Sequence, residues 1–172
     1  MKLNLKKPIV FFDLETTGIN VSTARIVAIC YTNVMPNGNE LSRTMRINPE
    51  MSIPKEASDV HGITNDDVKD CPTFKEVARE IANEFEGCDV AGFNSNRFDL
   101  PLLAEEFLRK AVELAPSNYW YRYRLARLYA MTRRQELTVD MYEDLLEDFP
   151  KKSDLYFELV ELYAGQGEYE KA

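Results

Sequence analysis

The 172-residue sequence contains one histidine, one tryptophan and three widely spaced cysteines. No Cys-x-x-Cys pair occurs, and one histidine cannot complete the usual Cys and His ligand sets, so no zinc site is expected. No apolar run approaches the ~18 residues that a transmembrane helix needs. The basic start, Met1 to Lys7, leads into an apolar run that reaches Asp13 too soon for a signal peptide. We therefore expect no membrane association, free thiols and a reducing, cytoplasmic environment.

Positive charge is also scarce. The sequence has 21 lysines and arginines against 29 aspartates and glutamates, and its formal net charge is −8. This balance argues against a broad basic surface for nucleic acid. It does not exclude a nuclease, because divalent metal ions neutralise a carboxylate-rich site. The length suits one domain or two small ones.

The first half of the sequence predicts a small sheet. Residues 9–14 form a short apolar run, which is typical of a strand buried on both faces. A second strand is expected over residues 25–34 and a third over 40–47, with a strong turn signal at Pro36-Asn37-Gly38-Asn39 between them. These three strands are expected to form an antiparallel meander.

Helices and one more strand follow. Residues 48–71 are expected to be loop with short helical turns. Thr73 and Glu76 match a capping box, which predicts a helix that ends near Gly87. Residues 89–93 predict a short strand whose edge is exposed at Val90. Another helix is expected from Asp99, with one apolar face made of Leu100, Leu103, Phe107, Ala111 and Leu114.

The rest of the sequence is expected to be helical and contains an internal repeat. Pro116 and Pro150 are 34 residues apart, and the same offset relates Leu125 to Leu159, Leu128 to Leu162, Tyr129 to Tyr163 and Ala130 to Ala164. That period is typical of tetratricopeptide repeats, which are pairs of antiparallel helices, and the segment resembles that family. Tyr169 and Ala172 also fall at its usual positions. The helix at 99–115 fits both the tetratricopeptide pattern and the pattern of the α/β part that precedes it.

Two carboxylates on the first strand suggest chemistry. Asp13 and Glu15 are two residues apart, so their side chains point to the same face of the strand. Two buried charges need a partner, and a divalent metal ion is an economical one. The spacing is common, however, and Asp13 by itself could be a simple strand-end carboxylate.

The residues around these carboxylates resemble a known family. Asp13-Leu14-Glu15-Thr16-Thr17-Gly18 matches the first motif of the DnaQ-like (DEDD) 3′-to-5′ exonucleases, and Asn94-Ser95-Asn96-Arg97-Phe98-Asp99 resembles the second. His61-Gly62-Ile63-Thr64 resembles a further family feature between the two. The resemblance covers about residues 7 to 110, in the right order.

This resemblance implies an α/β, ribonuclease-H-like fold with a mixed sheet. Asp13, Glu15 and Asp99 would be catalytic and would hold Mg²⁺ or Mn²⁺, with two ions in the family. The substrate would be the 3′ end of single-stranded DNA or RNA. The terminal nucleotide would meet the backbone around Thr16, Thr17 and Gly18, with His61 and Asn94 nearby.

Simpler interpretations exist for single residues. His61 could be a loop or packing histidine, and Asp99 could be a helix N-cap. Phe11, Phe12 and Phe98 are expected in the core. Only the combination of motifs favours a site.

The family's third motif, His-x-x-x-x-Asp or Tyr-x-x-x-Asp, does not occur after Asp99. We therefore expect a truncated exonuclease-like domain at 1–110, with reduced or lost activity, joined to tetratricopeptide-like helices at 99–172. The alternatives are a protein- or peptide-binding module and a hybrid without function. The binding module would use these aromatic and basic residues of the helices: Tyr119, Trp120, Tyr121, Tyr123, Arg122, Arg124, Arg127, Arg133 and Arg134.

Overall fold

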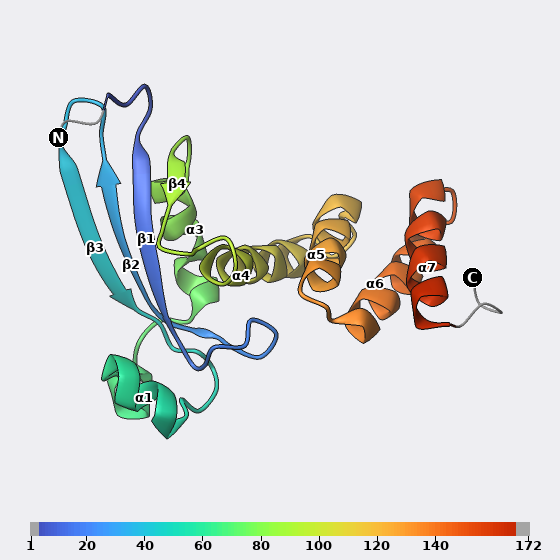
Figure 1. The fold of residues 1–172 in the computed structure, drawn as a ribbon, viewed down its shortest axis with the longest axis horizontal. Helices are drawn as coiled ribbons and strands as arrows, with labels where there is room; N and C mark the ends of the chain where they lie inside the picture. The colour runs from blue at the N-terminus through green and yellow to red at the C-terminus, as the bar shows by residue number, and fades with distance from the viewer. Residues whose placement is uncertain (1–3, 168–172) are drawn as a thin grey trace. The chain divides into compact units, whose positions relative to one another are not determined.

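The computed structural model describes residues 4–167, and the chain divides into two compact units, Met1–Glu106 and Phe107–Ala172 (Figure 1). The first unit carries all four strands and the second is helical. The division falls inside one helix, α4 (Asp99–Leu114).

The first unit is built on a mixed four-stranded sheet with the strand order β3-β2-β1-β4 (Figure 1). Strands β1 (Ile9–Thr16), β2 (Ile26–Val34) and β3 (Glu40–Arg46) pair antiparallel, and β4 (Asp89–Ala91) pairs parallel with β1. The predicted antiparallel meander is therefore confirmed. Its tight turn has Gly38 at φ 87°, a backbone conformation that favours glycine.

Burial along β1 alternates, so the prediction of a strand buried on both faces is wrong. Val10, Phe12 and Leu14 are buried, whereas Phe11 is 41% exposed and Asp13 is exposed. The buried face is covered by α3 (Phe74–Phe85), whose Phe85 ring makes edge contacts with Phe12 and with Tyr31 of β2. The expectation that Phe11 lies in the core is therefore corrected.

The segment after β3 contains two short helices, α1 (Lys55–His61) and α2 (Asn65–Val68). The side chain of Asn65 pairs with both backbone groups of Ile53, accepting from its N–H at 2.8 Å and donating to its C=O at 3.3 Å. These two hydrogen bonds fix the loop that leads into α1. The predicted capping box at Thr73 and Glu76 is confirmed at the start of α3.

Strand β4 lies at an edge of the sheet, as expected, and Val90 is 40% exposed. Helix α4 begins at Asp99 as predicted, but its expected apolar face is only partly correct. Leu103 is buried, whereas Leu114 is 72% exposed, and Glu106 is buried instead. Glu106 can be buried because Arg25 pairs with it.

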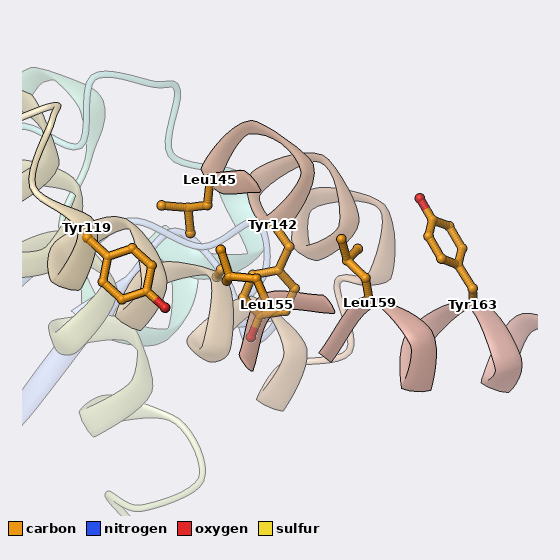
Figure 2. Packing of buried hydrophobic residues seen from close by; sticks show 7 residues of the cluster. Tyr119, Tyr142, Leu145, Leu155, Leu159 and Tyr163 are labelled. Carbon is orange, nitrogen blue, oxygen red and sulfur yellow. The ribbon is translucent and has the colours of Figure 1, made fainter. Parts of the chain in front are cut away.

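The second unit contains α5 (Tyr119–Met131), α6 (Gln135–Asp148) and α7 (Ser153–Gln166). Asn118 caps α5, accepting hydrogen bonds from the N–H groups of Trp120 and Tyr121. Tyr142 and Leu145 of α6 pack with Leu155, Leu159 and Tyr163 of α7 in one buried cluster (Figure 2).

The helices of the second unit keep the 34-residue correspondence at two pairs of buried positions, Leu125 with Leu159 and Tyr129 with Tyr163. The tetratricopeptide resemblance itself stays a prediction. Tyr169 and Ala172 lie outside the described residues. Across residues 4–167, no helix is both long and apolar enough to cross a membrane.

Candidate active site

The candidate site begins at the end of β1. Asp13 and Glu15 lie on the same face of the strand, Asp13 exposed and Glu15 half-buried. The pairing register with β2 shifts between Glu15 and Thr16, which marks a bulge where the strand leaves the sheet. The chain then turns through Thr17 and Gly18.

Asp99, the first residue of α4, joins this strand. Its carboxylate is buried, with the residue only 8% exposed, and it accepts a hydrogen bond from the backbone N–H of Leu14. Burial and the negative charge of Asp13 raise the pKa of Asp99, and the hydrogen bonds partly oppose this. The structure therefore brings the first and second sequence motifs together.

Two neighbouring carboxylates that repel each other fit a divalent cation, because the cation would offset both charges. Among residues 4–167, no group of three or more His, Cys, Asp or Glu side chains is gathered closely enough to hold a metal ion. The three predicted ligands Asp13, Glu15 and Asp99 are therefore not gathered into one cluster, and the metal site stays a prediction.

Glu15 lines a pocket of about 590 Å³ between the end of β1 and α1. The same pocket is lined by Thr16, Thr17, Gly18 and His61, which are four of the five residues predicted to bind substrate. The rest of its wall comes from Ile19, Pro54, Glu56, Ala57 and Val60. Asn94, the fifth predicted residue, does not line this pocket; it is exposed and has a positive φ of 52°.

The hydroxyl groups of Thr16 and Thr17 make hydrogen bonds that hold the turn after β1. Thr16 Oγ1 donates to the carbonyl of Gly18 at 2.7 Å. Thr17 Oγ1 accepts from the N–H of Arg25 at 3.0 Å and contacts Met51 Sδ at 3.8 Å. Both side chains therefore shape the loop, and a ligand in the pocket would meet mainly the backbone and the neighbouring side chains.

His61 is the last residue of α1, and Gly62 ends the helix in the left-handed conformation. Its Nδ1 accepts a hydrogen bond from the backbone N–H of Ile63 at 3.1 Å, so in the neutral ring Nε2 carries the proton. Nε2 is buried and has no hydrogen-bond partner in the described part of the chain. A buried N–H without a partner is unfavourable.

The ion pair between Arg25 and Glu106 was not predicted from the sequence. Arg25 Nε lies 2.5 Å from Glu106 Oε1 and Nη2 lies 3.2 Å from Oε2, a bidentate arrangement. One signal was present: Glu106 follows Asp99 by two helical turns, which places both carboxylates on one face of α4. Nothing local pointed to Arg25.

Comparisons with known proteins identify the family of the chain. The RNase T family model, described as Exonuclease, matches residues 10–154. The chain belongs to this exonuclease family. The match extends through α5 and α6 to the start of α7.

Two curated relatives of this chain are DNA polymerase III epsilon subunits. The subunit from Buchnera aphidicola subsp. Schizaphis graminum (strain Sg) is 30% identical over 112 residues, which is 61% of this chain and 47% of the relative. The subunit from Escherichia coli (strain K12) is 31% identical over 106 residues, 57% of this chain and 42% of the relative. The chain thus spans less than half the length of these relatives.

Solved structures of exonuclease I share the fold. One complex of exonuclease I with the SSB C-terminus is 19% identical, with a TM-score of 0.56 over 62% of this chain and 25% of that one. The Methylocaldum szegediense enzyme is 22% identical, with a TM-score of 0.56 over 60% of this chain and 24% of that one. Escherichia coli exonuclease I with a dA16 oligonucleotide is 20% identical, with a TM-score of 0.55 over 61% and 24%.

Proposed function

We propose that the first unit performs metal-dependent hydrolysis of the terminal phosphodiester bond at the 3′ end of single-stranded DNA or RNA. The observation that carries this proposal is the hydrogen bond from Leu14 N–H to the Asp99 carboxylate. This hydrogen bond joins the first sequence motif to the second, next to Asp13. Family membership supports the reaction class.

Asp13 and Asp99 would hold Mg²⁺ or Mn²⁺, and Glu15 would complete the ligand set for one ion or for the family's two. When bound, the metal would supply an activated water and would stabilise the departing oxygen. The chain contributes the fixed carboxylates. Asp99 is oriented by Leu14, and the strand geometry places Asp13 and Glu15 on one face.

The pocket beside Glu15 would receive the terminal nucleotide. His61 would lie beside the substrate as part of the pocket wall, and the turn at Thr16-Thr17-Gly18 would offer its backbone. Asn94 would lie farther along the substrate strand. These contacts orient the 3′ end and leave the scissile phosphate near the carboxylates.

Activity should be weak, because the sequence after Asp99 holds neither form of the third motif. A positioned general base contributes about 10²- to 10⁴-fold to such reactions. A missing fourth carboxylate would also weaken at least one metal site.

The test is degradation of a 3′-labelled single-stranded oligonucleotide with Mg²⁺ or Mn²⁺. An adenine oligodeoxynucleotide is a suitable first substrate, because exonuclease I with the same fold has been solved with dA16. Metal-dependent loss of label that vanishes in Asp13→Ala would support the proposal. The control is Asp70→Ala, because Asp70 is an exposed carboxylate in the turn between α2 and α3. Equal label loss in the wild type and in Asp13→Ala would overturn it.

A second candidate function is protein or peptide binding through the helices of the second unit. The observation in its favour is on α5, where Trp120 is 58% exposed and Tyr121 is 38% exposed beside the exposed Arg124 and Arg127. Aromatic and arginine side chains are typical of binding hot spots. Loss of peptide binding in Trp120→Ala, with metal binding intact, would support this function.

A further inference from the structure

Arg25, just before β2, contacts two parts of the candidate site at once. Its backbone pairs with Thr17: the N–H of Arg25 donates to Thr17 Oγ1, and the C=O of Arg25 accepts from Thr17 N–H, both at 3.0 Å. Its side chain pairs with Glu106 of α4 through two hydrogen bonds, at 2.5 and 3.2 Å. One residue therefore connects the pocket turn to the helix that carries Asp99.

Glu106 and Asp99 are seven residues apart on α4, which is about two turns or ~10 Å along the helix axis. Side chains at this spacing share a face of the helix. The N-terminal end of that face is attached to β1 through the bond between Asp99 and Leu14 N–H, and the other end is attached through Glu106 to Arg25. Two attachments on one face fix both the rotation of α4 and its position along its axis.

The ion pair is suited to this task. The Glu106 side chain is 5% exposed and that of Arg25 is 25% exposed, so water competes little for the carboxylate. A guanidinium that pairs with a carboxylate through two parallel bonds fixes direction as well as distance. A second carboxylate, Glu50, lies 3.8 Å from Nη2 of the same arginine.

We propose that Arg25 is a positioning residue: its pairing with Glu106 holds α4 so that Asp99 reaches Leu14 and Asp13, while its backbone holds the Thr17 turn. The consequence for catalysis rests on the proposed function. The consequence for geometry does not, because the bond between Asp99 and Leu14 can be followed without metal or substrate.

A purely structural ion pair would affect global stability alone. If Arg25 is a positioning residue, the loss of its pairing with Glu106 should also have a local effect. It should expose the amide of Leu14 specifically. The neighbouring amides of β1, which are held by the sheet, should keep their protection.

The experiment is amide hydrogen exchange by NMR on the full chain. It compares the wild type with Glu106→Ala, with Arg25→Lys and with Arg43→Ala. Arg25→Lys keeps the charge but lacks the forked geometry. Arg43→Ala is the control, since Arg43 is on β3 and makes an exposed ion pair with Glu80 of α3. We expect exchange at Leu14 to accelerate about tenfold or more in Glu106→Ala and by less in Arg25→Lys. It should be unchanged in Arg43→Ala.

Two further measurements connect geometry to function. The affinity for Mn²⁺ should fall about tenfold in Glu106→Ala and in the double variant Arg25→Ala/Glu106→Ala alike, because the two side chains act as one unit. For oligonucleotide hydrolysis, kcat should fall more than KM rises.

The outcomes separate the two proposals. Exchange at Leu14 in Glu106→Ala within about twofold of the wild type overturns the positioning role. A wild type that neither binds Mn²⁺ through Asp13 nor cleaves the oligonucleotide overturns the proposed function, while accelerated exchange would still support the geometric role of Arg25. If Glu106→Ala does not fold, Arg25→Lys decides, and unchanged Leu14 exchange in that variant also overturns the role.

Discussion

The buried carboxylate of Asp99 accepts a hydrogen bond from the backbone N–H of Leu14, the residue between Asp13 and Glu15. This bond anchors the start of α4 to β1, beyond the point where β4 stops pairing with that strand. It also places a carboxylate near another carboxylate in a partly desolvated place, which raises the pKa of Asp99. An arrangement that is unfavourable without a cation is typical of a site that binds one.

Replacing Asp13 should therefore improve stability and abolish metal binding together. In Asp13→Asn, the loss of like-charge repulsion should raise the free energy of unfolding by about 0.5 kcal/mol, or the Tm by about 1–2 °C. The same change should remove the increase in Tm that Mn²⁺ produces in the wild type. Thermal unfolding with and without Mn²⁺ measures both effects.

The matched control is Asp70→Asn, which changes the same net charge at an exposed position. It should leave both the Tm and the Mn²⁺ effect nearly unchanged. An equal Mn²⁺ effect in Asp13→Asn and the wild type would show that the metal binds elsewhere.

The dependence of the free energy of unfolding on pH should reflect the ionisation of Asp99. Its pKa is raised in the folded state, so the folded protein binds the Asp99 proton more tightly than the unfolded chain does. The free energy of unfolding therefore falls as pH rises from about 4, the ordinary aspartate value, through the raised pKa, and this contribution is constant above it. The stabilisation from Asp99 is present at low pH and lost on raising the pH.

Urea unfolding at a series of pH values from about 4 to about 7 measures this effect. Asp99→Asn keeps an oxygen that can accept from Leu14 N–H but cannot titrate. Its stability relative to the wild type should rise across the interval in which Asp99 ionises. A constant difference between the two proteins at all pH values would contradict the raised pKa.

Local patterns in the sequence predict much of this fold. The three-strand meander follows from apolar runs and the turn at Gly38, and the start of α3 follows from the capping box at Thr73 and Glu76. The family motifs predicted the grouping of Gly18 with His61, which line one pocket. In each case the controlling interactions are short in sequence or belong to a specific motif.

Features that depend on the tertiary structure were not predicted. Phe11 lies in an apolar run, yet it is 41% exposed because the run alternates between the two faces of the sheet. Glu106 is buried because a partner 81 residues away neutralises it. Periodicity assigns a glutamate to the solvent face, and only the tertiary structure shows the arginine that changes this. Whether Asp13, Glu15 and Asp99 bind metal stays a prediction.

The core of the second unit should be sensitive to truncation at Leu155. This side chain is fully buried in the cluster that also contains Tyr142 and Leu145 (Figure 2). Leu155→Ala should lower the free energy of unfolding by about 2–5 kcal/mol, because the cavity is enclosed by two helices. Urea unfolding followed by the fluorescence of Trp120, the single tryptophan, reports on this unit.

Phe157, on the same helix, provides the comparison, because it is 71% exposed. Phe157→Ala should change stability by no more than about 0.5 kcal/mol. Similar losses in both variants would mean that the cluster does not form as described.

Gly92 should tolerate no side chain, because it lies between β1 and the loop that leads to Asp99. A Cβ at this position would be 2.8 Å from the carbonyl oxygen of Phe12 and 2.9 Å from Cβ of Ser95. The carbonyl of Ser95 accepts from Leu100 N–H at 2.8 Å, so displacement of Ser95 would be transmitted to the start of α4. Gly92→Ala should therefore cost about 1–3 kcal/mol in stability and also weaken Mn²⁺ binding.

Gly165 of α7 provides the control for Gly92. A Cβ on Gly165 would meet nothing within 4 Å, so Gly165→Ala should stabilise the protein by about 0.5–1 kcal/mol and leave Mn²⁺ binding unchanged. Denaturant unfolding and Mn²⁺ titration of the two variants test this, and a Gly92→Ala protein with wild-type Mn²⁺ affinity would show that the loop does not control the position of Asp99.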